Sequence, residues 1–475
     1  MRKSAYVMVI ACLSIAMTAC AVGPNYTQPK LSVPDSFGEV QPVAATIYAT
    51  VSTNQQFWTL FNDELLNQLV HAALAENNTL RAAQARVKQA RAIHRQSSLD
   101  LLPTITAQGG YSEVLSSKSQ LPTGYARESK GYDAALDATW ELDLFGQKRR
   151  ALEAARAEVQ GTLASLQDAQ IVVIGEVTRS YFELRGQQLQ LQLIQRNVSN
   201  QQETLRITRA RFDAGRGSEL DLSRAQALYA TSNANAAPLQ AAIARSIHRL
   251  SVLTGQQPNA LSAVLSPQAA LPALPQLIAV GDPALLLRRR PDIRVAERHL
   301  AADTARVGVA IADLFPHVSF TGSVGAVASS VNALSDSGNG TRLIAPGISW
   351  AAFDLGRVYA RVKASRAQSE VALAEYQQTV LAALQDTEDA LVTHARAREQ
   401  LLHLAEAAAA SDRAAELAEI RYENGATDFL EVLDAQRSAL QAQDSLALSR
   451  TETATSLVAV YKALGGGWED SVSTR

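Results

Sequence analysis

The feature that most limits the possible folds of this chain is a stretch of 68 residues, 357–424, without a glycine or a proline. Apolar side chains recur in it at intervals of three and four residues, at Leu373, Tyr376, Val380 and Leu384. This spacing predicts a single helix, which at about 1.5 Å per residue would be on the order of 100 Å long. Helices of globular proteins average about 11–12 residues, so the length favours a tube of packed helices, with a two-stranded coiled coil as the alternative.

The long stretch belongs to the second of two copies of one sequence unit. RFDAGRGSELDLSRAQ at 211–226 matches RYENGATDFLEVLDAQ at 421–436 without a gap, at an offset of 210. Further upstream, NNTLRAAQARV at 77–87 is similar to RPDIRVAERHL at 290–300, at an offset of 213. Such self-similarity predicts two structural repeats, each with a helix, a short middle segment, a long helix, a turn and a final helix.

Proline marks the boundary between the two copies. Six prolines between 256 and 292 predict an irregular connector there. We therefore expect a signal peptide (1–19), a lipidated N-terminal arm (20–62), a first repeat (63–255), a connector (256–280), a second repeat (281–465) and a C-terminal tail (466–475).

The first twenty residues differ chemically from the rest of the chain. Arg2 and Lys3 precede a short apolar run, and both cysteines, Cys12 and Cys20, lie in this segment. This is the layout of a secretory signal, too short to span a membrane in the mature protein. Cys20 stands where a bacterial lipoprotein carries its lipid, so we expect a covalent lipid there; an unmodified cysteine beside a cleavage site is the alternative. Because Ala21 and not aspartate follows, sorting to the outer membrane is expected.

Four short segments alternate between apolar and polar residues with the period of two that is typical of strands: 104–112, 132–144, 317–327 and 343–354. Each has about the 9–11 residues that a membrane-crossing strand needs, although a half-buried strand of a soluble protein has the same pattern. In lipid a sheet must close on itself, and four strands are too few for a barrel, so several chains are expected to pool their strands. The acidic positions of the second segment, all expected to face water, are Asp133, Asp137, Glu141 and Asp143.

Composition argues against several other functions. The 44 Lys and Arg residues are balanced by 46 Asp and Glu residues, so no basic excess is available for a nucleic acid. The seven histidines are scattered without the spacing of a metal site, and no glycine-rich phosphate loop is present. We therefore expect no enzyme activity, no metal and no cofactor besides the lipid. The basic cluster at 288–292 is interpreted as a solvated helix start, with an acidic partner or anionic lipid as the less favoured alternative.

Several of these motifs together point to one family. CAVGPNYTQP at 20–29, FWTLFNDELL at 57–66 and the doubled R-[FY]-x-x-G turns resemble TolC-like outer membrane factors, and most closely their NodT-type lipoproteins. The resemblance covers essentially the whole mature chain. It implies a mainly α-helical fold with a small transmembrane β part, in which long helical hairpins form a periplasmic tube and four strands per chain complete a trimeric barrel in the outer membrane.

The resemblance also implies a function and partners. Proteins of this family are homotrimers that form the exit duct of tripartite efflux systems, together with a periplasmic adaptor and an inner-membrane RND-type pump. The alternative from a different class is a lipid-anchored periplasmic spacer or adaptor without a pore. Such a spacer would share the signal and the helices, but it would not need four alternating strands.

The doubled turn is where the tube is expected to meet its adaptor and to close. Gly215 and Gly425 are expected to end the long helices in a left-handed conformation, with Ser218 and either Thr427 or Asp428 capping the next helices. The residues expected at the docking tips are Arg211, Gly215, Ser218, Arg421, Gly425 and Thr427.

The resemblance also assigns a gate to the same region. Glu431 and Asp434 match the positions of two inward-facing carboxylate rings, and Asp221 and Tyr422 match a network that holds this end shut. A ring of carboxylates concentrates negative potential and favours cations. Thr427 replaces a basic gate partner, so Arg421 or Arg211 is expected to substitute. The alternative for Asp221 and Glu431 is a plain helix cap, which the helix dipole favours.

Overall fold

The computed structural model describes residues 21–30, 34, 36–38, 48–49, 56–122, 124, 126–276, 278–280 and 283–468. The predicted signal peptide, the lipidation site Cys20 and most of the predicted tail lie outside these residues. The chain forms two compact units, and each is described by itself. The sheet unit consists of Met1–Lys30, Arg86–Leu163 and Arg294–Gln377, and the hairpin unit of Leu31–Ala85, Ala164–Ile293 and Gln378–Arg475. Each unit contains parts of both sequence repeats, whose boundaries stay predictions.

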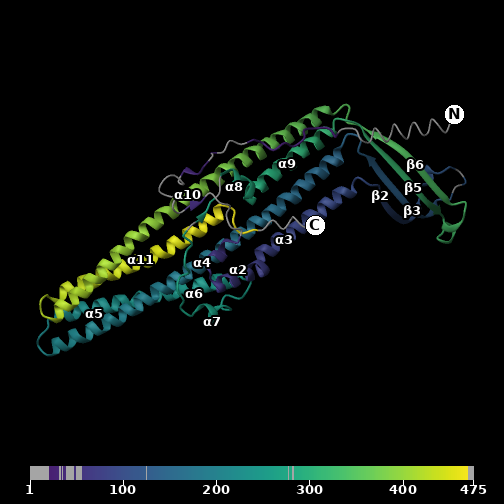
Figure 1. Ribbon diagram of the computed structural model, residues 1–475. Helices are drawn as coiled ribbons and strands as arrows, with labels where there is room; N and C mark the ends of the chain where they lie inside the picture. The colour runs from purple at the N-terminus through teal and green to yellow at the C-terminus, as the bar shows by residue number, and fades with distance from the viewer. Residues whose placement is uncertain are drawn as a thin grey trace. The chain divides into compact units, whose positions relative to one another are not determined.

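The sheet unit is built around four antiparallel strands in the order β2-β3-β5-β6, which lie side by side in Figure 1. Their bounds are β2 Thr104–Leu115, β3 Glu128–Leu142, β5 His317–Ala328 and β6 Gly340–Ser349. The 3-10 helices η4 (Lys118–Gln120) and η5 (Asn332–Ser335) lie between the strands of the two hairpins. The four predicted strands are confirmed, and each repeat supplies one hairpin.

Two of the predicted strands extend too far, while the observed β2 continues to Leu115 and the observed β3 and β6 begin earlier, at Glu128 and Gly340. The last strand ends at Ser349 and not at 354, because the Asp354 amide donates to the Ala351 carbonyl and closes a turn before helix α10 (Leu355–Glu423). The second strand ends at Leu142 and not at 144, because the Leu144 amide bonds back to the Leu142 carbonyl at 2.9 Å. Side-chain alternation continued past both turns and concealed them in the sequence.

The register divides the sheet into an apolar and a polar face. Leu136 of β3 lies opposite Ala107 of β2 and Val324 of β5, so these side chains share one face. On the outer strands of this face, Ile105 and Ile344 are 71% and 84% exposed in the protomer. A sheet face that is both apolar and exposed requires a lipid environment or another protein to cover it.

Alanine lets the helices of the sheet unit pack closely. These helices are α3 (Asn78–Leu99), α4 (Gln147–Asp213), α9 (Pro291–Ala312) and α10, each of which continues into the hairpin unit. The core between α4 and α9 consists of the buried residues Ala154, Ala157, Ala301, Ala302 and Ala305. Because alanine side chains are small, the backbones of α4 and α9 can approach closely, and no large core residues are needed between them.

One contact occurs twice in the sheet unit and verifies both sequence offsets. The Trp140 indole N–H donates to the Leu101 carbonyl, and the Trp350 indole N–H donates to the Leu314 carbonyl, each at 3.0 Å. The tryptophans are related by the offset of 210 and the leucines by the offset of 213. Trp140 lies in β3, two residues before its end, and Trp350 directly follows β6. Each bond reaches the turn that precedes the neighbouring strand of the same repeat.

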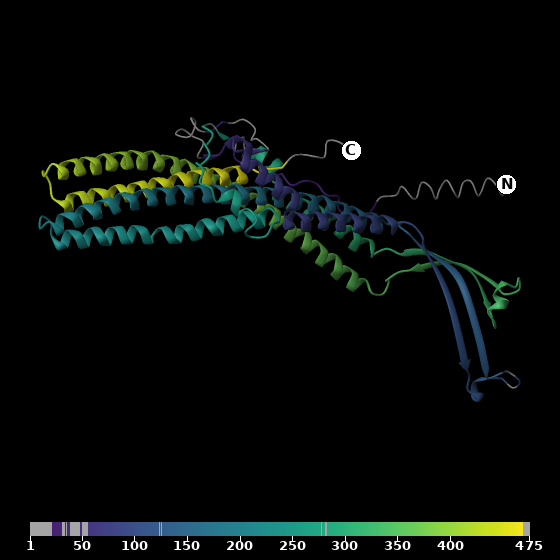
Figure 2. The ribbon, with the colours of Figure 1, turned by 90° about the horizontal axis from the view of Figure 1, so that it is seen from below.

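The hairpin unit contains the turn-forming ends of the long helices. Figure 2 shows α4, α5 (Glu219–Ala234), α10 and α11 (Phe429–Ala463) side by side in this unit. The 69 residues of α10 confirm the helix predicted from the stretch without glycine or proline. The smaller elements are η3 (Phe57–Phe61), α2 (Glu64–Glu76), α6 (Ala236–Leu253), α7 (Ser262–Leu265), α8 (Pro283–Arg289) and the parallel pair β1 (Tyr48–Ala49) and β4 (Ile278–Ala279).

The two repeats differ in the helix that follows the turn. The second repeat has one continuous helix, α11, whereas the first is divided at Asn235 into α5 and α6. Pro238 lies in the first turn of α6. Proline is tolerated there because the first amides of a helix have no partner within the helix, but it would break a bond inside a continuous one.

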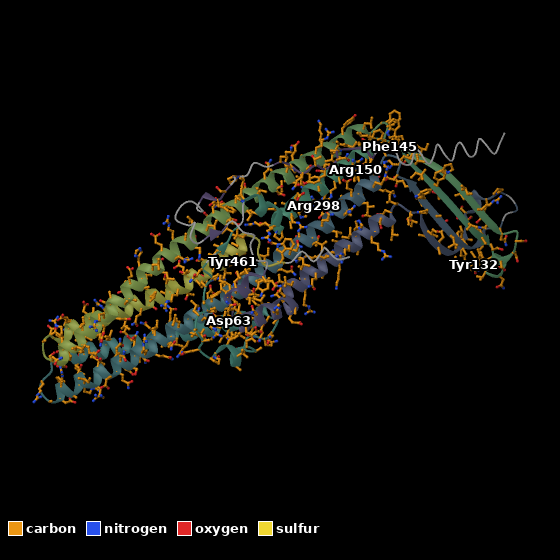
Figure 3. The ribbon with its side chains drawn as sticks, viewed as in Figure 1. Asp63, Tyr132, Phe145, Arg150, Arg298 and Tyr461 are labelled. Carbon is orange, nitrogen blue, oxygen red and sulfur yellow. The ribbon has the colours of Figure 1, made fainter. Side chains whose placement is uncertain are left out.

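Aromatic and polar contacts join η3 and the start of α2 to the long helices of the hairpin unit, and Figure 3 labels two of the residues involved, Asp63 and Tyr461. The Phe57 ring stacks on Tyr461 with centroids 4.9 Å apart. The Tyr181 hydroxyl donates to Asp63 Oδ2 at 2.7 Å, while Asp63 Oδ1 caps α2 by accepting from the Leu66 amide at 2.9 Å. Among the residues that the structure describes, no helix is both long and apolar enough to cross a membrane.

Candidate functional site at the helix tips

Both long helices end in the same backbone motif. Gly215 and Gly425 have φ angles of 69° and 71°, in the left-handed region where only glycine is unstrained. The Gly215 amide bonds the Phe212 carbonyl at 2.9 Å, and the next amide reaches the Arg211 carbonyl at 2.8 Å. The second copy repeats this pair of bonds around Gly425 at 3.0 and 2.8 Å. These are Schellman motifs, so the predicted helix ends are confirmed.

Each following helix is capped by a side chain, but by a different residue type. Ser218 Oγ accepts from the Asp221 amide at 3.1 Å, and its hydroxyl donates to Asp221 Oδ2 at 2.7 Å. In the second copy, Asp428 Oδ1 accepts from the Glu431 amide at 3.1 Å. Of the two cap candidates at the second tip, Asp428 takes the position, which leaves Thr427 free for another contact.

Glu431 is the centre of the second tip. Arg421 Nη1 lies 3.3 Å from Glu431 Oε1, and the Thr427 hydroxyl donates to Glu431 Oε2. Arg421 thus supplies the positive charge that position 427 lacks, while Thr427 adds a neutral hydrogen bond. The Arg421 and Glu431 side chains are 57% and 51% exposed. An exposed pair of this kind contributes only about 0–1 kcal/mol, so competing contacts can break it.

The two tips touch through a cation and a ring. Arg211 of the first tip places its guanidinium carbon 4.3 Å from the centroid of the Tyr422 ring of the second tip. The Tyr422 ring in turn lies 5.5 Å from the ring of Phe429. Buried residues behind them, Ala225, Ala418, Phe429 and Val432, form a small apolar cluster that joins the hairpins. A cation–π contact at such an exposed position contributes about 0.5–1 kcal/mol.

The structure therefore brings together three of the residues predicted at the docking tips with two of the predicted gate residues. The docking-tip residues are Arg211, Arg421 and Thr427, and the gate residues are Tyr422 and Glu431. Among the contacts of the described residues, Asp221 bonds its own cap, and Asp434 lies 3.0 Å from Arg437 Nη2 one turn further along α11. Arg437 and Phe429 are further residues of this region, and neither was predicted from the sequence. Arg437 could have been found from its spacing, because it lies three residues after Asp434 on the same helix, where oppositely charged side chains meet.

The acidic residues of the sheet fall into two groups. Asp133, Asp137 and Glu141 occupy every fourth position of β3, on the face opposite to the exposed apolar side chains. Glu141 also pairs with His317 Nδ1 at 2.8 Å and with Lys148 Nζ at 3.4 Å. No three His, Cys, Asp or Glu side chains within the described ranges are placed to hold a metal ion.

Asp143 has a different place from the one predicted for it. It follows the end of β3, and its two carboxylate oxygens accept from the Lys148 and Arg149 amides at 2.9 Å. The Arg149 side chain adds a contact to Oδ2 at 3.0 Å. The carboxylate therefore binds the start of α4, where the helix dipole favours a negative charge, instead of continuing the row of strand acids.

Comparison with known proteins gives a consistent result. A model of the family described as outer membrane efflux protein matches residues 69–256 and again 283–466. The chain is 32% identical over 465 residues to the probable efflux pump outer membrane protein TtgC of Pseudomonas putida, covering 96% of this chain and 95% of that protein. It is 31% identical over 458 residues to nodulation protein T of Rhizobium leguminosarum bv. trifolii, covering 96% of each. Among solved structures, the outer-membrane channel OprN has a TM-score of 0.87 and 40% identity, covering 94% of this chain and 100% of that one.

Proposed function

Because this chain belongs to the outer membrane efflux protein family, we propose that three copies of it form the exit channel of a tripartite efflux pump. The family consists of transport channels of the outer membrane, and the chain is such a channel protein and not an adaptor. The resemblance stated from the sequence motifs is thereby confirmed. The number of copies, the RND-type pump and the periplasmic adaptor belong to the proposal.

The proposal depends mainly on the four-stranded sheet, whose two edge strands are each paired on one side only among the described strands of the protomer. β2 and β6 are its two edge strands in the protomer, and the face that they share with β3 and β5 is apolar and exposed. Backbone groups at a sheet edge cannot stay unpaired in lipid, so each edge needs a strand from another chain. Three protomers would supply twelve strands, within the range of about 8 to 26 found in outer membrane barrels.

The tip contacts of the hairpin unit support a gate there. Arg421, Thr427 and Glu431 tie the second turn together, and Arg211 and Tyr422 tie it to the first. All of these are weak interactions of exposed or half-buried side chains, and an incoming adaptor hairpin can replace their partners. We expect Glu431 and Asp434 of three chains to narrow the closed channel, and Cys20 to carry the lipid that anchors each chain in the outer membrane.

Single-channel conductance tests this proposal. Purified wild type is reconstituted in planar bilayers beside the Glu431→Ala/Asp434→Ala double variant. The control is Glu416→Ala, which removes the carboxylate of an exposed pair with Arg413 on α10. We expect a small wild-type conductance that rises in the double variant and stays unchanged in the control. A folded trimer without any conductance in the double variant would contradict the channel, and equal conductance in all three proteins would contradict the gate.

A further inference from the structure

The chain segment directly after Cys20 lies in a groove of the sheet unit, which is formed by Gly146, by Arg150 of α4 and by Gly308 of α9. Residues 21–30 form neither a helix nor a strand, and the Val22 amide donates to the Phe145 carbonyl at 3.1 Å, just after β3. Ala21 lies against Gly146, where an added Cβ would come within 2.6 Å of the Ala21 Cα atom. The segment is thus fixed at the junction of β3 and α4, one residue from the proposed lipid attachment point.

A buried arginine holds this segment by its backbone. Arg150 of α4 is only 4% exposed. Its Nε donates to the Val22 carbonyl at 3.1 Å, and its Nη2 reaches the carbonyls of Ala21 and Gly23 at 3.4 and 3.3 Å and Asn25 Oδ1 at 2.7 Å. Its Nη1 bonds Glu153 on the same helix, so the segment provides most of the acceptors for this guanidinium. A buried guanidinium without such acceptors would be strongly unfavourable. Figure 3 shows Arg150 and Phe145 near each other in the sheet unit.

Two glycines give the segment room to approach the helices. Gly23 has a φ of 95°, and a Cβ added to it would lie 2.5 Å from the Gly308 Cα atom of α9. A Cβ on Gly308 would lie 2.8 Å from Arg150 Cγ and 2.9 Å from the Val22 carbonyl oxygen. The groove therefore accepts a peptide backbone only because both positions lack side chains.

Tyr26 secures the other end of the docked segment. Its hydroxyl donates to Glu297 Oε1 at 3.0 Å, and the guanidinium carbon of Arg298 lies 5.4 Å from its ring centroid. The ring packs against the alanine core between α4 and α9. The contacts of Gly23, Asn25 and Tyr26 thus explain why three of the four residues GPNY (23–26), within the motif CAVGPNYTQP, are of these types.

We propose that Arg150 and Gly308 form a receptor for the backbone of residues 21–25, and that this receptor holds the lipid of Cys20 beside the β3–α4 junction of its own chain. The inference rests on the proposed lipidation of Cys20. The acyl chains then enter the membrane at a fixed point next to the sheet and not at the end of a loose tether. Arg150 acts as a positioning residue for the anchor.

Spin labelling of the full-length protein tests the receptor. Cleavage of the signal leaves Cys20 as the only native cysteine, and lipidation blocks its thiol, so Thr27→Cys introduces a unique labelling site on an exposed residue. Thr27→Cys is introduced into wild type, Arg150→Met and Gly308→Ala, and the mobility of the label is measured in each protein. The second variant raises the helix propensity of α9 while it places a methyl group in the groove, so it is expected to fold. Arg156→Met and Gly161→Ala serve as controls, because Arg156 is exposed on α4 and a Cβ at Gly161 meets its nearest atom at 3.4 Å.

We expect an immobile label in wild type and in both controls. In Arg150→Met and Gly308→Ala the ratio of mobile to immobile label should rise about tenfold or more, since one hydrogen bond to a charged group is worth about that factor. Equal mobility in the lipidated wild type and both groove variants would overturn the receptor and leave the proposed function intact. Failure of the lipid anchor is detected separately, by the intact mass of the protein. If Cys20 carries no acyl group and the protein is labelled at two thiols while the segment is still docked, the proposed anchor is overturned.

Discussion

Acidification should destabilise the hairpin unit through one buried histidine. His394 of α10 is 1% exposed, and its Nδ1 lies 3.0 Å from Ser456 Oγ of α11. Burial, with a smaller contribution from the charge of Arg398, lowers the pKa of His394 to about 4. In the unfolded chain its pKa is about 6.5, so the unfolded state binds the proton more tightly.

The magnitude follows from the difference between these two pKa values. At 1.36 kcal/mol per pH unit, the gap between 6.5 and about 4 corresponds to about 3 kcal/mol per protomer. This stability is fully present above pH 6.5, decreases as the pH falls, and is lost below about pH 4. At pH 4.5 we expect about 2.5 kcal/mol of it to be gone.

Denaturant unfolding of the detergent-solubilised protein, followed by helical circular dichroism at pH 7.5 and pH 4.5, measures this loss. Protein concentration is held constant, because association contributes to apparent stability. His394→Asn keeps a polar group near Ser456 but cannot be protonated, so its stability should depend less on pH. His403→Asn, at an exposed position of the same helix, is the matched control. If wild type and His394→Asn lose equal stability between the two pH values, the reasoning is refuted.

Substitutions at three sites test side-chain contacts within the two units, each by the same unfolding measurement. An added Cβ at Gly186 of α4 would collide with the Thr451 side chain, so Gly186→Ala should cost about 1–3 kcal/mol. Gly186→Ala/Thr451→Ala should recover part of this cost, because the Cβ atom of residue 451 would still lie 2.9 Å away, and no recovery would show that the cost lies elsewhere. Tyr181→Phe removes the hydroxyl that donates to Asp63 and should cost about 1.5–3 kcal/mol, and an unchanged midpoint would argue against this bond. Trp140→Phe keeps the ring but loses the indole hydrogen bond, which should lower stability by about 1 kcal/mol, whereas Trp140→Ala should cost clearly more.

Local patterns were sufficient to predict the elements of this fold. The stretch 357–424 became the single helix α10, because no residue in it interrupts helical hydrogen bonding. Gly215 and Gly425 end their helices as expected, since the left-handed conformation is a property of one residue and its nearest neighbours. The alternating segments became strands for the same reason, although their ends depended on turns that alternation does not reveal.

Contacts between segments that are distant in the sequence could not be predicted from local patterns. Arg150 in QKRR looks like its half-buried neighbours, and only the folded chain brings it to residues 21–25, which lie 125–129 positions away. Asp143 continues the alternating acids of β3, so its role at the start of α4 was concealed by a pattern that fits both. Thr427 was noted as a departure from the family, but its bond to Glu431 depends on the exact course of the turn.

The paired tryptophan contacts record where this chain has tolerated changes in length. Trp140 is bonded 39 residues after its partner Leu101, and Trp350 is bonded 36 residues after Leu314. Since the two copies arose from one unit, three residues were inserted or deleted between contacts that both survived. Evolution thus kept the base of each hairpin and varied what lies between. For protein engineering, the hairpin connections 116–127 and 329–339 are accordingly the places to insert an epitope tag without disturbing the sheet.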